Sequence, residues 1–260
     1  MRRGWIATLG LVILVAAACS TPAQSRVVIA AGTTLVDSQF MARLVDAYRS
    51  VDPDTDLAVI GLSSAEAVAL ADAGSADVII THSREALDAY LSTHARSLST
   101  EVFVGTFFAV ADPTIEFNVA SFEDALRVVG ERGYPFVSRD DHSGTNAAEL
   151  AAWKSIGVDP STEPWYIKTG TGMGATLQVA NERHAVTLTD HGTYLASASA
   201  LTLQPVANTV FPNPYDLTLV DPQADPDAKS FVEWLVSPAG ALAIETANND
   251  LFGIQVYVVR

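Results

Sequence analysis

The sequence is poor in the residues from which most metal and redox sites are built. It has one cysteine, Cys19, so the folded part of the chain can form no intramolecular disulfide, no zinc–thiolate cluster and no catalytic thiol. The histidines show no i, i+4 pairing and no glutamate at a metal-ligand spacing. We therefore predict neither a bound metal nor a cofactor. The five histidines are His82, His94, His142, His184 and His191.

Basic residues are scarce as well. Lys and Arg number 15 against 30 Asp and Glu, which gives a formal net charge of −15. Such a surface repels phosphate backbones and anionic lipid headgroups, so we predict no nucleic-acid partner. A small anion would gain nothing from long-range attraction either. If this chain binds anions, short-range hydrogen-bond donors in one cleft must supply the affinity.

The signatures of nucleophilic and nucleotide-dependent enzymes are also absent. No G-x-S-x-G motif occurs, and His142 and Ser143 cannot form a nucleophile–base pair because they are adjacent in sequence. The glycine-rich run at residues 170–174 lacks both the G-x-G-x-x-G spacing and the lysine of a P-loop. We therefore predict that the protein is not an enzyme.

The N-terminus has the shape of a secretory signal. A basic start at Met1–Arg3 is followed by an apolar stretch over residues 5–15 and by small residues before Cys19. This arrangement resembles the lipoprotein box of bacteria, which implies a signal peptide at residues 1–18, lipidation of Cys19 and a tether at residues 19–25. The protein would then be attached to the membrane by its lipid anchor, on the extracytoplasmic side. The alternative is an ordinary cleaved signal.

The rest of the chain alternates between strand and helix patterns. Apolar strands at residues 26–31, 57–60 and 76–80 are separated by helical stretches, which is typical of a parallel sheet with crossover helices. The long apolar run at residues 102–111 predicts a segment that crosses into a second part of the molecule. We predict an α/β protein of two lobes, each a mainly parallel sheet flanked by helices, rather than one continuous sheet.

The predicted lobe boundaries follow from that crossing segment. Lobe 1 comprises residues 26–107 and 207–260, and lobe 2 comprises residues 108–206. Ligands of parallel sheets bind at the carboxyl ends of the strands. In lobe 1 these ends carry the hydroxyl residues Thr33, Thr34, Ser63 and Ser64.

One arginine stands out in lobe 2. Arg139 follows an apolar strand, and Ser143-Gly144-Thr145 opens a helix soon after. A fixed cation beside free amides at a helix start suits a small oxyanion. A salt bridge to Asp140 or Asp141 is the alternative. If both aspartates point away, the pocket offers donors only and suits a fully deprotonated oxyanion. If one faces inward, phosphate becomes a candidate.

A second set of donors is expected after the strand at residues 165–169. Glycines at positions 170, 172 and 174 precede a helical stretch, so the backbone at Met173-Gly174-Ala175-Thr176 can close on a ligand. A flexible turn with no ligand is the alternative.

Taken in order, four motifs resemble one family. They are Thr33-Thr34 with Asp37-Ser38; Ser138-Arg139-Asp140-Asp141 with Ser143-Gly144-Thr145; Thr169-Gly170 with the run 172–177; and Thr187-Leu188-Thr189-Asp190 with Gly192-Thr193-Tyr194-Leu195. The chain is similar to the substrate-binding proteins of bacterial tungstate ABC transporters over nearly its whole mature length. The resemblance implies a type II periplasmic-binding-protein fold whose lobes close over the ligand.

The resemblance also implies a function and a site. We expect a monomeric lipoprotein that captures tungstate, with molybdate as a second ligand, and delivers it to an ABC transporter permease. Alternatives are a receptor for phosphate or sulfate, and an envelope lipoprotein that senses or docks without transport. The implied oxyanion-binding residues are Thr33, Thr34, Ser63, Ser64, Arg139, Ser143, Gly144, Thr145, Met173, Gly174, Ala175 and Thr176.

Overall fold

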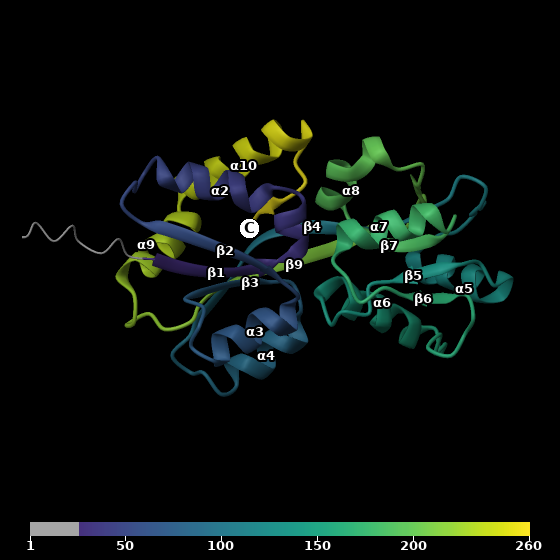
Figure 1. The fold of residues 1–260 in the computed structure, drawn as a ribbon, viewed down its shortest axis with the longest axis horizontal. Coiled ribbons are helices and arrows are strands. Elements are labelled where there is room, and N and C mark those ends of the chain that lie inside the picture. Colours follow the sequence, from purple (N-terminus) through teal and green to yellow (C-terminus); the bar gives the residue numbers. More distant parts are fainter. Residues whose placement is uncertain (1–25) are drawn as a thin grey trace, which may run out of the picture.

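The computed structural model describes residues 26–260 and has two lobes side by side along its long axis (Figure 1). The predictions for residues 1–25, namely the signal peptide, the tether and lipidation of Cys19, lie outside the described residues. The predicted α/β class is confirmed, because a central sheet is flanked by helices throughout.

Each lobe contains a three-stranded parallel unit. In lobe 1 the central β1 pairs with β2 and β3, and in lobe 2 the central β5 pairs with β6 and β7. Parallel strands put all their carboxyl ends on one edge, so the loops after them gather there. The strands are β1 (Arg26–Gly32), β2 (Asp56–Leu62), β3 (Val78–Thr81), β5 (Phe136–Ser138), β6 (Tyr166–Lys168) and β7 (Val186–Asp190).

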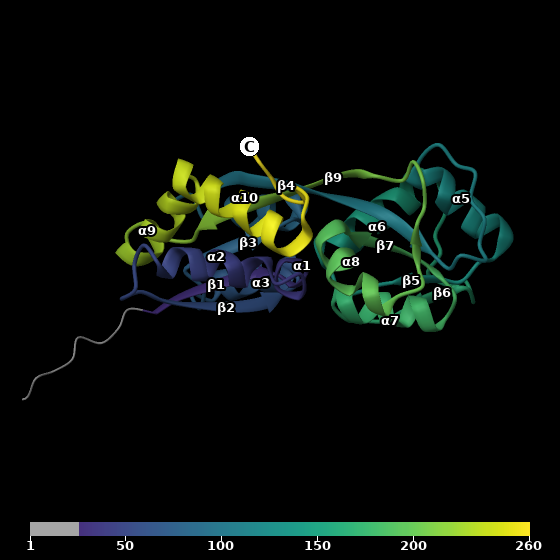
Figure 2. The ribbon, with the colours of Figure 1, turned by 90° about the horizontal axis from the view of Figure 1, so that it is seen from above.

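Two long antiparallel strands join the lobes, as Figure 2 shows from above. β4 (Leu98–Ala111) pairs with β9 (Phe211–Leu219) along most of its length, and from Phe107 onward it also pairs with β7. The path of hydrogen-bonded strands is therefore continuous, in the order β2-β1-β3-β9-β4-β7-β5-β6. The expectation of two separate sheets was wrong in this respect, because β4, at 14 residues, is long enough to belong to both lobes.

The sequence pattern did not reveal β9. Pro212 and Pro214 argue against a strand, since proline cannot donate a hydrogen bond to a neighbour. In the structure both lie in the part of β9 that pairs only with β4, while β3 pairs with residues 216–219. One side of the strand is thus unpaired where the prolines occur, so they are tolerated.

Helices cover both faces of the sheet, and each lobe has its own apolar core. In lobe 1 the amphipathic α2 contributes Phe40 and Leu44 to the core that also contains Tyr215 and Phe231. In lobe 2 Trp153 packs against Phe136 and Tyr166. The helices are α1 (Thr33–Asp37), α2 (Phe40–Arg49), α3 (Ser64–Asp72), α4 (Arg84–Leu91), α5 (Phe122–Arg132), α6 (Gly144–Ser155), α7 (Met173–Glu182), α8 (His191–Ser197), α9 (Pro226–Leu235) and α10 (Pro238–Phe252).

Two short strands complete the sheet, β8 (Gln204–Pro205) and β10 (Val258–Val259), both paired with β4. Within residues 26–260, no helix combines the length and the apolar character needed to cross a bilayer.

Candidate functional site

The guanidinium of Arg139 lies between the two lobes. Arg139 directly follows β5 and is 2% exposed. One terminal nitrogen donates to Thr33 Oγ1 of lobe 1 at 2.8 Å, and the other donates to Thr145 Oγ1 of lobe 2 at 3.4 Å. The cation therefore contacts hydroxyls on both sides of the gap, where a ligand held by both lobes would lie.

The two aspartates after Arg139 have different roles. Asp141 Oδ2 accepts from Arg139 Nε at 3.1 Å and from a terminal nitrogen, and Asp141 Oδ1 accepts from Ser143 N at 3.2 Å. Asp140 adopts a left-handed backbone conformation, with φ of 49°, and pairs with the exposed Lys168 at 3.6 Å. The predicted salt bridge exists, with Asp141 as the partner, and it coexists with the interlobe position of Arg139.

Thr33 and Thr34, which directly follow β1, are the first residues of α1. The helix N-cap is Gly32, which has no side chain to accept from the first amides. Thr34 is buried, and its hydroxyl lies 2.9 Å from Tyr215 Oη. The start of α1 therefore offers a side-chain hydroxyl and backbone donors together.

A chain of hydrogen bonds fixes the Thr34 hydroxyl. Asn213 donates from Nδ2 to Tyr215 Oη at 3.1 Å, and His82 Nδ1 lies 3.0 Å from Asn213 Oδ1. Burial, helped by nearby Arg139, lowers the pKa of His82 to about 4, so the ring is neutral at pH 7. With this amide orientation, neutral His82 donates to Asn213. Either hydroxyl can be the donor in the bond between Tyr215 and Thr34.

Ser63 and Ser64 are already engaged at the start of α3. Ser63 is its N-cap, and Ser63 and Glu66 form a reciprocal capping box. Ser64 is fully buried and its hydroxyl accepts from His82 N at 3.4 Å. Each of the two hydroxyls thus accepts a hydrogen bond from a backbone amide of lobe 1, and Ser64 lies beside His82.

The start of α6 packs against lobe 1. Ser143 caps the helix by accepting from Asn146 N at 3.2 Å. Gly144 lies so close to lobe 1 that a Cβ there would come within 2.4 Å of the His82 carbonyl oxygen. Any side chain at this position would force the lobes apart, so glycine is required for the contact.

At the start of α7, the backbone rather than the side chains faces lobe 1. Gly174 N donates to Asp37 Oδ2 of lobe 1 at 3.2 Å. The Met173 side chain is buried in the core of lobe 2, and the Thr176 hydroxyl donates to Gly172 O at 3.0 Å. Ala175 is exposed. Of the four predicted residues, Gly174 is the one that forms a hydrogen bond with the other lobe.

Asp190, at the end of β7, is a buried carboxyl group that was not among the predicted site residues. It is 1% exposed, and Oδ1 accepts from Thr193 N at 2.8 Å, which caps α8. Oδ2 has no hydrogen-bond partner among residues 26–260. Burial raises the pKa of Asp190 to about 6, against the opposing effects of the Thr193 bonds and of Arg139.

Glu149 on α6 is a second buried carboxyl group, and it is fully engaged. It accepts from Ser138 Oγ and Tyr166 Oη, both at 2.6 Å, and from Trp153 Nε1 at 3.2 Å. Burial raises the pKa of Glu149 to about 7 even though these donors favour the charged form. This cluster lies within lobe 2 and ties α6 to β5 and β6.

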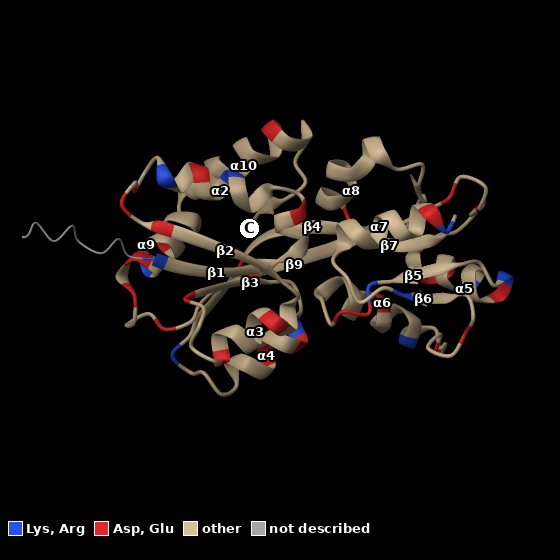
Figure 3. Cartoon of the chain, viewed as in Figure 1, with Lys and Arg blue, Asp and Glu red and all other residues tan. Residues whose placement is uncertain are grey.

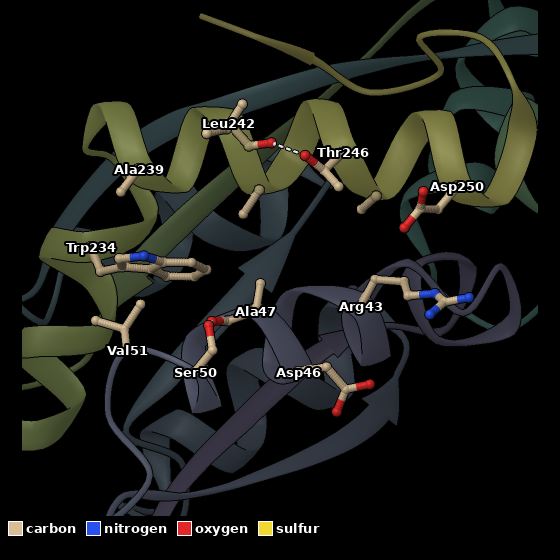
Figure 4. A pocket seen from close by; sticks show the side chains of 12 residues that line it. Arg43, Asp46, Ala47, Ser50, Val51, Trp234, Ala239, Leu242, Thr246 and Asp250 are labelled. Carbon is tan, nitrogen blue, oxygen red and sulfur yellow. Dashed lines mark hydrogen bonds between the residues drawn. The ribbon is translucent and has the colours of Figure 1, made fainter.

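Two cavities lie in different parts of the molecule, one between the lobes and one within lobe 1. A cleft of about 580 Å³ opens between α4 of lobe 1 and α6 of lobe 2, and His142 and Asn146 line it. A second groove of about 410 Å³ lies between α2 and α10, between Trp234 at one end and Arg43 and Asp250 at the other (Figure 4). None of the predicted site residues lines that groove.

Acidic residues are spread over both lobes and basic ones are few (Figure 3).

Comparisons with known proteins agree on one family. Residues 18–239 match the family model of the PBP superfamily domain. A solved structure described as the tungstate ABC transporter from Geobacter sulfurreducens has a TM-score of 0.74 and 30% identity, covering 86% of this chain and 99% of that one. The tungstate-binding protein TupA of Peptoclostridium acidaminophilum is 27% identical, over 91% of this chain and 86% of that protein.

Another relative matches over a shorter stretch. A Haloferax volcanii protein, whose name describes an anion-binding protein of an ABC transporter, is 36% identical over 208 residues. The match covers 74% of this chain and 60% of the Haloferax protein, so the chain spans less than two thirds of that relative's length.

Proposed function

Because the chain belongs to the PBP superfamily, we propose that it captures tungstate, with molybdate as a second ligand, and delivers it to an ABC importer. The observation that carries the proposal is the buried Arg139, whose guanidinium contacts hydroxyls of both lobes. The site is one of binding, and we assign no catalytic residue. Names of relatives that bind tungstate or anions support the choice of ligand.

The donors at the interlobe gap match the needs of a tetrahedral oxyanion. Thr33, Thr34 and Thr145 provide hydroxyls, Arg139 provides the charge, and the starts of α1 and α6 provide amides. A charge-assisted hydrogen bond contributes about 1.5–3 kcal/mol. Four or five such bonds, less the costs of ordering and desolvation, are enough for a nanomolar complex, which requires about 12 kcal/mol.

We also propose that ligand capture closes the two lobes about β4 and β9. On this proposal, lobe 1 comprises residues 26–107 and 207–260, and lobe 2 comprises residues 108–206. The lobes meet through Arg139 and Thr33, through Asp37 and Gly174, and through the Thr193 hydroxyl, which donates to Thr34 O at 3.4 Å. A ligand that bonds to both lobes would favour this closed arrangement.

Attachment and delivery complete the proposal. Cys19 would carry the lipid and residues 19–25 would form the tether, so that the monomeric receptor stays near its permease on the extracytoplasmic side. Mass spectrometry of the membrane-extracted protein tests this directly, because lipidation adds a defined mass to a chain that begins at Cys19.

The test of the binding site is calorimetric titration with tungstate. We expect Arg139→Ala to weaken binding at least about tenfold, since it removes the charge and several donors at once. Arg43→Ala is the matched control, because Arg43 is exposed and lies on α2, away from the gap. Unchanged affinity in the Arg139 variant would refute the assignment.

Phosphate is a second candidate ligand because of one observation. Asp190 is a buried carboxyl group with a free oxygen, and a carboxylate can accept the proton of hydrogen phosphate. Thermal unfolding in the presence of tungstate, molybdate, sulfate or phosphate separates the candidates, because only a bound ligand raises the midpoint.

A further inference from the structure

Asp190 Oδ2 is unusual among the buried polar atoms of residues 26–260. Only one other buried side-chain oxygen or nitrogen in that part of the chain lacks a partner, the neutral hydroxyl of Thr81. Buried polar groups almost always find a hydrogen bond, so an orphaned carboxyl oxygen requires an explanation. The explanation must also account for its position on the face where the lobes meet.

The surroundings of Asp190 belong to both lobes. The residue ends β7 and starts α8, and Thr193 of α8 reaches Thr34 O on α1. Gly192 is packed so closely that a Cβ there would come within 2.3 Å of Tyr257 Oη in lobe 1. The carboxyl group therefore lies beside the start of α1, one wall of the proposed site.

The ionisable groups around Asp190 do not neutralise it. Arg139, after β5, attracts its charge, but Asp141 already pairs with that cation. Tyr215 on β9 and Tyr257 near the C-terminus have raised pKa values, to which the charge of Asp190 contributes, so both stay neutral. His191 follows in sequence, and its ring packs edge-on against Phe108 of lobe 2.

The protonation state of Asp190 decides what the free oxygen can do. An ionised carboxylate accepts hydrogen bonds and repels a dianion, whereas a neutral carboxylic acid can donate one. Tungstate at neutral pH carries no proton and offers only acceptors. A carboxylate facing it would oppose binding. Burial raises the pKa of Asp190 to about 6, so the ligand-free residue is mostly ionised above pH 6.5 and must take up a proton before it can donate.

We infer that Asp190 is a further ligand-binding residue, whose neutral carboxyl group donates from Oδ2 to the captured oxyanion, so that binding takes up one proton from water. This inference rests on the proposed function. The expected class of ligand is a fully deprotonated tetrahedral oxyanion. Hydrogen phosphate would bring its own proton, and its capture by ionised Asp190 would take up none.

The test is calorimetric titration with sodium tungstate between pH 6.5 and 8.5, in pairs of buffers with different ionisation enthalpies. For the wild type we expect uptake of about one proton and an affinity that falls at least about tenfold across this range. Asp190→Asn keeps an acceptor for Thr193 N and supplies a permanent donor in place of Oδ2. It should bind with little or no proton uptake and with an affinity that changes less than about twofold.

Glu149→Gln is the control, because Glu149 also has a raised pKa but both its oxygens are engaged within lobe 2. This variant should keep the proton uptake of the wild type. The inference is overturned if wild-type binding takes up no proton, if Glu149→Gln abolishes the uptake, or if folded Asp190→Asn fails to bind. Absence of tungstate binding by the wild type at every pH would instead refute the proposed function.

Discussion

Glu149 and Asp190 are both carboxyl groups buried in lobe 2, and burial raises the pKa of each. They differ in their partners. Every oxygen of Glu149 accepts from a neighbouring side chain, whereas Asp190 has one oxygen with no partner in the described part of the chain. A satisfied buried carboxyl group is part of the architecture, and an unsatisfied one at an interlobe face indicates a place where a ligand completes the bonding.

The largest expected effect is on stability, at Glu149. Glu149→Ala leaves three buried donors, on Ser138, Trp153 and Tyr166, without their acceptor. We expect the free energy of unfolding to fall by about 3–5 kcal/mol, which lowers the thermal midpoint by roughly 6–20 °C. Differential scanning calorimetry measures the change.

The control for that experiment is Glu163→Ala. Glu163 is exposed, so its side chain should contribute within about 0.5 kcal/mol. If both variants unfold at the wild-type temperature, the Glu149 cluster has no structural role and the contrast with Asp190 is lost.

The next effect is also on stability, but at Asp190 the substitution should stabilise the protein rather than destabilise it. Because burial raises its pKa from 3.8 to about 6, the native state binds more protons than the unfolded state between these values. The wild type therefore loses stability as the pH rises through this window, and Asp190→Asn does not. Above pH 6 the variant should be more stable by up to about 3 kcal/mol, since each pKa unit corresponds to about 1.4 kcal/mol.

Urea unfolding at pH 4 and pH 7 measures this difference. The two proteins should be close in stability at pH 4 and diverge at pH 7, with the variant the more stable. A constant gap at both pH values would mean that Asp190 is not a destabilising charge in the ligand-free protein, and its resemblance to Glu149 would be closer than the bonding suggests.

The smallest expected effect tests a contact at the exposed edge of the gap. Asp37→Ala removes the acceptor for Gly174 N, a single hydrogen bond between the lobes. We expect tungstate affinity to fall about threefold, since a net contribution of about 0.5–1 kcal/mol is typical of such a bond. Asp37→Asn keeps an oxygen acceptor and should stay near the wild type.

A loss in the Asp37→Asn variant equal to that of Asp37→Ala would show that charge, not the hydrogen bond, holds α7 against lobe 1. A loss at Asp37 as large as that at Arg139 would mean that closure, rather than direct contact with the ligand, dominates affinity. Titration calorimetry on both variants gives these comparisons.

Much of the architecture was predictable because it is local. Alternating strand and helix patterns indicated the α/β class, and the apolar run before Asp112 indicated a crossing segment. The missed elements have physical reasons. β9 contains two prolines, and α1, which begins at Thr33 directly after β1, has a glycine N-cap with no side chain to mark the helix start.

The site was also predictable only where its residues have a local signal in the sequence. The sequence marked Arg139 and the start of α6 because a charge after an apolar strand and a Ser-Gly-Thr helix start are visible over a few residues. Asn213, Tyr215 and His82 carried no comparable signal, although together they form the hydrogen-bonded chain that reaches the Thr34 hydroxyl from positions as far as 181 residues away. Asp190 belongs to the motif at residues 187–190, but the sequence does not show that its Oδ2 lacks a hydrogen-bond partner in the described part of the chain.

The sequence by itself determined the α/β class, the acidic surface and the presence of one arginine among donors, because these depend on composition and on neighbours along the chain. Only the tertiary structure decided which hydroxyls meet Arg139, that Asp141 rather than Asp140 pairs with it, and that Asp190 is buried with a free oxygen. The physical reason is that hydrogen-bond partners and desolvation depend on residues brought together from distant parts of the chain.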